Sequence, residues 1–374
     1  MTTIPAKPSH SQPSHHQSGH GADDLRQLYC PPTTLVAWDF TNQELAEAIN
    51  GGRLLCPSLD LSNTCNLNCP YCFTEPADSP HKKRRPDELS EGELLSVIKQ
   101  MATAGARTIN IIGAGEPLLD PRFERIARFI HQLGIRLLVA TNGLELVRRP
   151  GLLTLLNTLE ANIALKLNTL DPTLEDAMVG KAGYAAQRDQ AMSALLAAGF
   201  NNGVPSRLAI ITIVTTGNQQ EIASLHEYCR MQNIVFIAGP YMPAGRTAAI
   251  HPHDGKTTTT KDQPAWTPLD PAALARIREQ LREWDHTRGY PVVNNPAYTS
   301  GLPCVQSLGV HVDATGTIWP CPTRQQLSNG ELRNKPLGKV DNADANHLSK
   351  IYRDHPYMHQ VRAAYRGDCT RNWG

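Results

Sequence analysis

Hydrophobic positions in residues 58–237 alternate between two periods. Short apolar, β-branched runs predict strands, whereas apolar residues at three- and four-residue spacing predict helices. The predicted strands are Ser58–Ser62, Thr108–Ile112, Ile135–Ala140, Asn162–Leu167, Leu208–Val214 and Ile234–Ile237. The predicted helices between them are 91–104 (after the capping pattern Ser90–Glu93), 121–133, 152–159, 187–198 and 219–231. This alternation predicts an α/β fold with a parallel sheet and helices outside it.

Six strand–helix units are too few for a full (β/α)8 barrel, so a partial (β/α)6 TIM-like barrel and a doubly wound open sheet both satisfy the pattern. The unusual segments favour the partial barrel, because each follows a predicted strand and such loops converge on one rim of a parallel barrel. These segments are Cys65–Cys72, Gly113–Pro117, Thr141–Gly143, Asn168–Thr169 and Tyr241–Arg246.

Three cysteines, Cys65, Cys69 and Cys72, lie within eight residues. Pro70 disfavours a continuous helix through them, so a loop can fold the three sulfurs around one object. Thiolate is a soft ligand suited to zinc and to iron–sulfur clusters. A structural zinc site usually adds a second, closely spaced Cys or His pair, and no such pair lies nearby. Three ligands leave one coordination position for an outside ligand.

The spacing of these cysteines, with Tyr71 just before the last one, resembles the signature of the radical S-adenosylmethionine (radical SAM) enzymes. The resemblance implies that Cys65, Cys69 and Cys72 hold a [4Fe–4S] cluster with an open iron site for S-adenosyl-L-methionine. It also implies reductive cleavage of that cofactor to a 5′-deoxyadenosyl radical, which abstracts hydrogen from an unactivated carbon. Tyr71 would lie by the adenine, or would simply pack in the core.

Gly113-Ala114-Gly115-Glu116-Pro117 resembles the family's Gly-Gly-Glu-Pro motif, which contacts the amino group of S-adenosylmethionine, with Ala114 in place of the first glycine. The remaining cofactor-binding candidates stand at strand ends or in a Pro-x-Gly-Arg segment, where they could contact the ribose, the carboxylate or the substrate. Ordinary turn polarity, barrel-interior polarity or a surface ion pair are the alternatives. These candidates are Asn142, Lys166, Asn168 and Arg246.

Towards the C-terminus, Gly316–Cys321 resembles the hairpin that carries an auxiliary iron–sulfur cluster in twitch and SPASM extensions. Its strands would be 310–313 and 317–319. Cys304, Cys321 and Cys369 are the predicted ligands of one such cluster, whose fourth ligand is missing from the local pattern. The other cysteines, Cys30, Cys56 and Cys229, are interpreted as buried thiols.

The composition limits the possible partners and location of the protein but does not indicate a function. The chain has 374 residues and a net charge of +1, which gives no argument for nucleic acid or an anionic membrane as a partner. No apolar run reaches the roughly 18 residues of a membrane span and no signal peptide is visible, so a cytoplasmic location is expected. The predicted organisation is a disordered tail (1–22), an N-terminal lead-in with a helix at Gln43–Ile49 (23–54), a radical SAM core (55–250), a linker (251–270) and a twitch/SPASM-like domain (271–374).

The resulting prediction is a radical SAM oxidoreductase that receives electrons from a donor such as flavodoxin or ferredoxin. A small-molecule substrate (a polyol, aminosugar or nucleotide) is favoured, because residues 23–54 are too short for the leader-binding domain that peptide maturases often carry. The alternatives are a maturase acting on a ribosomally made precursor peptide and a zinc-stabilised binding module.

Overall fold

The computed structural model describes residues 35–74, 84–241, 245–248, 267–290, 308–322 and 335–363. The chain divides into residues 1–30, which lie outside this description, and a compact unit of residues 31–374, to which everything below refers.

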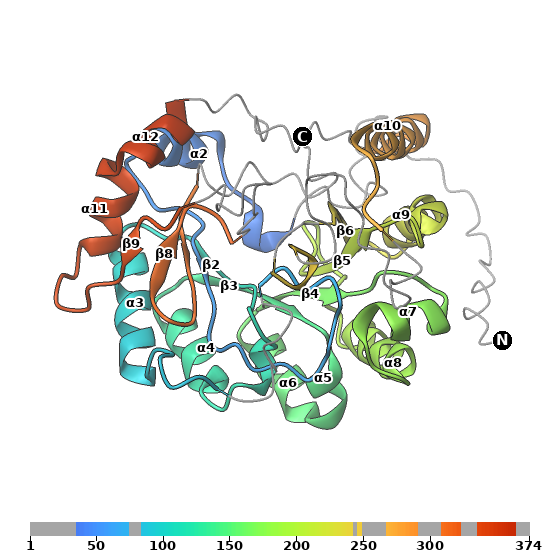
Figure 1. Ribbon diagram of the computed structural model, residues 1–374, viewed down its shortest axis with the longest axis horizontal. Helices are drawn as coiled ribbons and strands as arrows, with labels where there is room; N and C mark the ends of the chain where they lie inside the picture. Colours follow the sequence, from blue (N-terminus) through green and yellow to red (C-terminus); the bar gives the residue numbers. More distant parts are fainter. Residues whose placement is uncertain are drawn as a thin grey trace, which may run out of the picture. The chain divides into compact units, whose positions relative to one another are not determined.

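Six parallel strands form the main part of one sheet (Figure 1). They are β1 (Ser58–Leu59), β2 (Thr108–Ile111), β3 (Arg136–Thr141), β4 (Asn162–Lys166), β5 (Leu208–Val214) and β6 (Val235–Pro240). They lie side by side in chain order, from β6 to β1, and every neighbouring pair is parallel. In a doubly wound sheet, the order of the strands across the sheet reverses at a switch point. The order here never reverses, so the prediction of a partial barrel is confirmed.

Helices cover the outer face of this sheet, as Figure 1 shows. They are α3 (Glu91–Thr103), α4 (Phe123–Gln132), α5 (Leu144–Arg148), α6 (Pro150–Thr158), α7 (Pro172–Val179), α8 (Tyr184–Ala197) and α9 (Ile222–Met231). Outward-facing strand residues such as Val139 and Ile163 are fully buried in the same core as Phe123 and Leu195 from the helices. Burial of each such side chain stabilises the fold by roughly 1.5–3 kcal/mol.

The inner face of the strands carries smaller side chains and is filled from one end. Ala164 and Ala209 pack with Leu35 and Ala37, which belong to the segment around the short 3-10 helix η1 (Val36–Trp38). The backbone N–H of Ala37 donates to the Asn162 side chain at 2.9 Å, at the first residue of β4. This segment therefore covers the amino-terminal end of the strands and leaves the carboxyl-terminal end for a cavity. The predicted helix that follows is confirmed as α2 (Asn42–Ile49).

Some element boundaries differ from the sequence prediction. Helix α4 begins at Phe123 rather than at 121, because the Asp120 carboxylate accepts hydrogen bonds from the backbone N–H and guanidinium of Arg122 and shapes a turn. The predicted helix over 219–231 starts with a 3-10 turn, η3 (Gln219–Glu221), before α9. Helices α5 and α7 were not predicted at all.

Three short strands extend the sheet beyond β1: β7 (His311–Val312), β8 (Thr317–Trp319) and β9 (Gly338–Lys339). Strand β7 is parallel to β1, and β8 is antiparallel to β7, which confirms the predicted hairpin. Side chains also join β7 to β1. Ser58 Oγ lies 3.0 Å from Nδ1 of His311, and Nε2 of His311 lies 3.2 Å from the Asp60 carboxylate. The C-terminal strands and the first strand thus share one buried contact.

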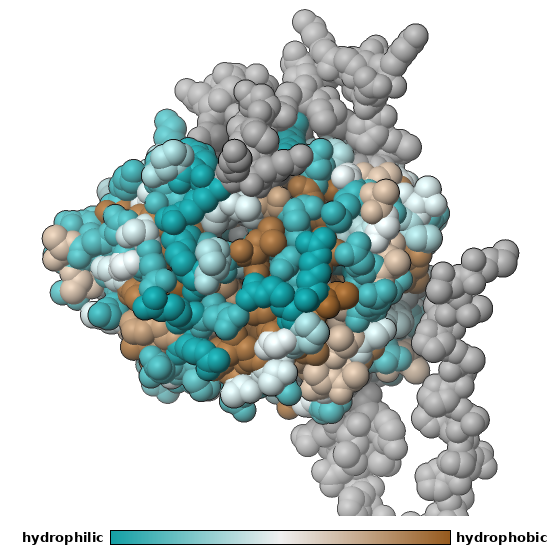
Figure 2. All heavy atoms as spheres, turned by 90° about the horizontal axis from the view of Figure 1, so that it is seen from below, coloured by the Kyte–Doolittle hydropathy of each residue, from teal (hydrophilic) through white to brown (hydrophobic). Residues whose placement is uncertain are grey.

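The remaining helices lie outside the strands. Helix α10 (Pro271–Thr287) packs on α9, where Asp285 accepts hydrogen bonds from the guanidinium of Arg230. Helix α11 (His347–Asp354) packs on α3 and is followed by α12 (Pro356–Ala363). On the face drawn in Figure 2, hydrophilic side chains surround small separate patches of hydrophobic ones. None of the described helices combines the length and apolar composition that a membrane crossing requires.

Candidate active site

A cavity of about 280 Å3 lies at the carboxyl-terminal end of the parallel strands. Its walls come from the cysteine loop after β1, from the loops after β2 and β3, and from inward-facing residues of β3, β4 and β5. The structure therefore brings together most of the sequence-predicted site residues. Those that line the cavity are Cys65, Cys69, Tyr71, Cys72, Gly113, Ala114, Gly115, Glu116, Asn142 and Lys166.

The cysteine loop is held from two sides. On one side, the backbone N–H of Asn68 donates to the Val179 carbonyl at the end of α7, at 3.0 Å. On the other, the backbone N–H of Arg246 donates to the Cys72 carbonyl at 3.0 Å, and the Arg246 guanidinium donates to the Asn68 side chain. Arg246 belongs to the 3-10 helix η4 (Gly245–Ala248). It thus contacts the loop itself, and its contact with a cofactor carboxylate stays a prediction.

The three thiols are suited to a metal cluster. Burial, together with the neighbouring Cys72 thiol, raises the pKa of Cys69 to about 12. Burial likewise raises the pKa of Cys65, with the nearby Glu116 carboxyl adding to the effect. Thiolates so placed are unfavourable alone, and bound iron would offset their charge. No three His, Cys, Asp or Glu side chains in the described ranges are grouped around a single ion position, whereas a four-iron cluster binds each thiolate at a different iron.

The glycine-rich loop packs directly against the cysteine loop. A Cβ atom added at Gly115 would lie 2.2 Å from the carbonyl oxygen of Thr64, and the backbone N–H of Glu116 donates to that oxygen at 2.8 Å. Gly113 has φ +71°, and a Cβ there would lie 2.4 Å from the Gly115 carbonyl oxygen. Gly115 is therefore required for contact between the two loops, and Gly113 is required for the turn within its own loop. Ala114, the departure from the family motif, accommodates its methyl group in the cavity wall.

Glu116 connects the loops after β2 and β3. Its carboxylate accepts hydrogen bonds from the backbone N–H groups of Leu118 and Asn142 and, at 2.6 Å, from the Thr141 hydroxyl. Burial raises the pKa of Glu116 to about 7, although these donors lower it. The Asn142 amide in turn donates to the Asn66 side chain at 2.7 Å, which ties the loop after β3 to the cysteine loop. Pro117 begins the 3-10 helix η2 (Pro117–Leu119) that follows.

Lys166, the last residue of β4, points into the cavity and is the one basic residue among the described residues that line it. Its ammonium lies 4.8 Å from the centroid of the Tyr71 ring. Burial lowers the pKa of Lys166 to about 8. Asn168 does not line the cavity, but its amide donates to the Tyr71 hydroxyl at 3.0 Å. Asn168 therefore contacts a residue of the cavity wall, Tyr71, without lining the cavity itself.

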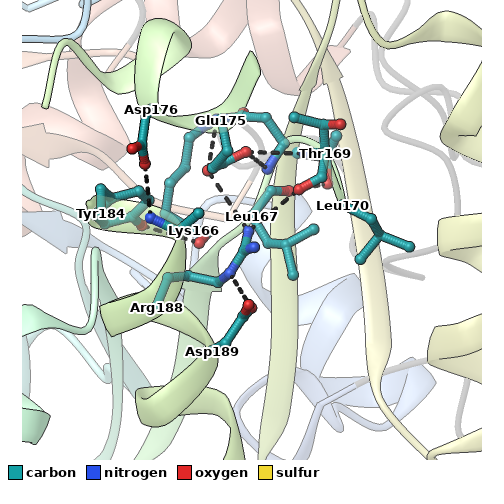
Figure 3. Close-up of polar contacts among 12 residues, drawn as sticks. Lys166, Leu167, Thr169, Leu170, Glu175, Asp176, Tyr184, Arg188 and Asp189 are labelled. Carbon is teal, nitrogen blue, oxygen red and sulfur yellow. Dashed lines mark hydrogen bonds and ion pairs between the residues drawn. The ribbon is translucent and has the colours of Figure 1, made fainter. Parts of the chain in front are cut away.

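Sequence reasoning missed a buried carboxylate behind this corner of the site (Figure 3). Glu175 of α7 accepts hydrogen bonds from the backbone N–H groups of Asn168 and Thr169, both at 2.9 Å, and Arg188 lies 3.8 Å away. A signal was present, because Asp171-Pro172 is a capping residue followed by a proline suited to the first helical turn. In the structure Asp171 caps α7 as that pattern predicts.

The predicted auxiliary ligands are only partly visible. Cys304 and Cys369 lie outside the described residues, as does Cys30. Cys321 is half-buried and follows β8, whose last residue pairs with His311 at the start of β7. It therefore lies at the amino-terminal edge of the sheet, opposite the edge that carries the cysteine loop. Cys56 and Cys229 are buried thiols, as predicted.

Comparison with known proteins agrees with this site. A family model described as "Radical SAM superfamily" matches residues 59–229, which include the three loop cysteines. The GTP 3',8-cyclase of Microcystis aeruginosa is 30% identical over 313 residues, covering 74% of this chain and 87% of that enzyme. The chain belongs to the radical SAM superfamily and is an enzyme. The family implies a [4Fe–4S] cluster and S-adenosylmethionine as its cofactors.

Two further similarities are to a maturase and to a protein of known structure. The mycofactocin maturase MftC of Mycobacterium tuberculosis is 25% identical over 284 residues, covering 72% of this chain. The present chain spans 64% of the length of that maturase. Streptococcus suis SuiB bound to S-adenosylmethionine has a similar fold, with a TM-score of 0.58 at 17% identity, covering 83% of this chain and 68% of SuiB.

Proposed function

We propose that Cys65, Cys69 and Cys72 hold a [4Fe–4S] cluster whose fourth iron is open to S-adenosylmethionine. The observation that supports this most directly is that the three thiols and the Gly113–Glu116 loop line one cavity at the carboxyl ends of the strands. When bound, the two cofactors supply a 5′-deoxyadenosyl radical, and the protein supplies position and shielding.

Different residues of the cavity would bind the cofactor and shield it from water. Backbone groups of Gly113–Gly115 are placed to bind the polar end of S-adenosylmethionine, with Asn142 and Lys166 as further polar contacts on the same cavity. Apolar side chains of the strands, and of the residue that follows β2, line the cavity and keep water from a reactive centre. These include Ile112, Ala140, Ala164, Ile211 and Ile213. Hydrogen abstraction from a carbon of the substrate is the expected outcome.

For the substrate, we favour a small polar molecule of the polyol, aminosugar or nucleotide class. Its support is the similarity to the GTP cyclase, which extends over 87% of that enzyme. The second candidate is a ribosomally made peptide, favoured by the similarity to the mycofactocin maturase. In either case a reduced protein such as flavodoxin or ferredoxin would supply the electron.

We also propose an auxiliary cluster on Cys304, Cys321 and Cys369, in a C-terminal domain of residues 271–374 joined by a linker (251–270) to the core of residues 55–250. Its support is the hairpin β7–β8 that leads to Cys321. Such a cluster would accept an electron from the substrate or anchor it.

Anaerobic reconstitution tests the central assignment. Wild-type protein with dithionite and S-adenosylmethionine is expected to release 5′-deoxyadenosine, and the Cys65→Ala/Cys69→Ala/Cys72→Ala variant is not. Release of 5′-deoxyadenosine by the triple variant at the wild-type rate would refute the assignment. Stimulation by GTP and other nucleotides, compared with stimulation by a short peptide encoded beside the gene, would decide between the two substrate classes.

A further inference from the structure

Thr74, two residues after the last cysteine of the loop, places its hydroxyl between the two loops of the site. The side chain lines the cavity together with Cys72 and Ala114. Its hydroxyl donates a hydrogen bond to the Ala114 carbonyl at 3.0 Å, and the same oxygen lies 3.3 Å from the Cys72 sulfur. One hydroxyl therefore contacts both a proposed cluster ligand and the loop proposed to bind S-adenosylmethionine.

The two contacts compete for a single hydrogen. A hydroxyl has one hydrogen to donate, whereas its oxygen can accept others. While Thr74 donates to Ala114, a thiol at Cys72 can donate its own hydrogen to the Thr74 oxygen. A sulfur that binds iron has lost that hydrogen, because the thiolate is the form that binds metal. Such a sulfur can only accept, and the Thr74 hydroxyl at 3.3 Å is a donor within its reach.

Rotation about one bond is enough to redirect the Thr74 hydroxyl. Both acceptors already lie within hydrogen-bonding distance of the same oxygen, so no heavy atom has to move. A hydrogen bond to an ionised acceptor is roughly twice as strong as one to a neutral group, which favours the thiolate over the Ala114 carbonyl. The released carbonyl would then offer one more acceptor on the loop that is proposed to bind the polar end of S-adenosylmethionine.

A second sulfur of the loop receives a donor that substitution cannot remove. The backbone N–H of Leu67 donates to the Cys65 sulfur at 3.5 Å. The hydroxyl of Thr74, by contrast, belongs to a side chain and is replaced by a methyl group of similar size in Thr74→Val. The contribution of this one hydrogen bond can therefore be measured.

We propose that Thr74 is a positioning residue that turns its hydroxyl from the Ala114 carbonyl to the Cys72 sulfur when that sulfur binds iron, and thereby raises the reduction potential of the cluster. Hydrogen bonds to the sulfurs are among the factors that set the potential of an iron–sulfur cluster. They stabilise its reduced form, because that form carries more negative charge. This inference rests on the proposed function, namely that Cys65, Cys69 and Cys72 hold a cluster.

The test is a redox titration of the reconstituted protein monitored by electron paramagnetic resonance, without S-adenosylmethionine, so that no cleavage occurs. The signal of this cluster is the one that the Cys65→Ala/Cys69→Ala/Cys72→Ala variant lacks. Thr74→Val is expected to shift the midpoint potential of that signal to a more negative value. Thr74→Ser keeps the hydroxyl and is expected to restore a midpoint potential close to that of the wild type.

The matched control is Thr212→Val. Thr212 of β5 lies between Ile211 and Ile213, which line the cavity, so its side chain points to the opposite face of the strand. Its buried hydroxyl donates to the Leu167 carbonyl at 2.5 Å. The control is expected to lower the melting temperature without moving the midpoint potential.

Iron analysis of each protein separates the possible failures. A reconstituted wild type that lacks the signal would refute the proposed function. Full iron content in Thr74→Val with an unchanged midpoint potential would refute only the present inference. Loss of the cluster from both Thr74→Val and Thr74→Ala would also overturn the inference, because the hydroxyl would then be needed to hold the cluster rather than to set its potential.

Discussion

The lack of a side chain at Gly115 allows the two loops of the site to pack together. A Cβ at this position would overlap the Thr64 carbonyl, which directly precedes Cys65. Gly115→Ala is therefore expected to displace the cysteine loop and to reduce both bound iron and S-adenosylmethionine affinity several-fold. Iron analysis and equilibrium dialysis would measure the two effects.

Ala114→Gly is the control for that change, because it alters the same loop without adding an atom. It is expected to retain iron content close to that of the wild type. Full iron content in Gly115→Ala, with only S-adenosylmethionine binding weakened, would contradict the structural role of this glycine.

Glu116 is expected to make stability depend on pH. Its pKa rises from 4.5 to about 7 on folding, so the folded protein retains the proton more strongly than the unfolded chain. The resulting stability is fully present below pH 4.5 and is lost as the pH rises through about 7. The difference corresponds to roughly 3 kcal/mol.

Urea unfolding of the metal-free protein at several pH values would measure this dependence. Glu116→Gln cannot titrate, so its unfolding free energy should change less with pH over this range, even though the variant is less stable overall. Parallel pH profiles of the two proteins would show that Glu116 does not titrate in this range.

At the scale of elements, α7 supports the site from behind. Its Val179 carbonyl binds Asn68, and a Cβ added at Gly180 would lie 2.5 Å from the Asn68 carbonyl oxygen. Gly180→Ala is thus expected to disturb the cysteine loop and to lower iron content, in addition to the strain of its φ of +64°. Measurement of iron per chain and of the melting temperature would separate the two effects.

Gly134→Ala provides the matched control. Gly134 has a similar φ of +69°, but no atom lies within 4 Å of an added Cβ. Both variants should lose about 1 kcal/mol of stability from backbone strain. Only Gly180→Ala should also lose iron. Equal iron content in the two variants would show that α7 does not hold the cysteine loop in the shape that binds iron.

Local signals explain which elements the sequence could predict. The strand at Leu208–Val214 was predicted correctly because it is a continuous apolar, β-branched run. The helix capped by Ser90 was predicted correctly because its apolar periodicity follows a capping box. Helix α5 spans only five residues, too few to show a helical period. The cavity depends on contacts between distant segments, such as Asn168 with Tyr71, and no local pattern encodes such a contact.

At the scale of the whole molecule, the chain is proposed to hold two clusters, one on the Cys65–Cys72 loop and one on Cys304, Cys321 and Cys369. Wild-type protein is then expected to hold about eight irons, and the Cys304→Ala/Cys321→Ala/Cys369→Ala variant about four. The variant should still release 5′-deoxyadenosine without substrate, since the cavity receives no wall from Cys321. It should fail to convert the true substrate.

Iron and sulfide analysis with Mössbauer spectroscopy of both proteins would test this prediction. Saturation of the wild type at about four irons would refute the auxiliary cluster and would mean that those cysteines have another role. Loss of 5′-deoxyadenosine formation in the variant would instead show that the two sites depend on each other.

The pairing of β1 with β7 has a consequence for how the chain folds. Ser58 and His311 are 253 residues apart in sequence, yet they lie in contact in adjacent strands. During synthesis, β1 acquires its neighbour β2 early, but its other edge stays unpaired until the ribosome has added most of the chain. Contacts over such separations form slowly, because a long loop must close first. The strand that leads into the cysteine loop is therefore among the last to be enclosed, so iron delivery to this loop is expected to follow synthesis rather than accompany it.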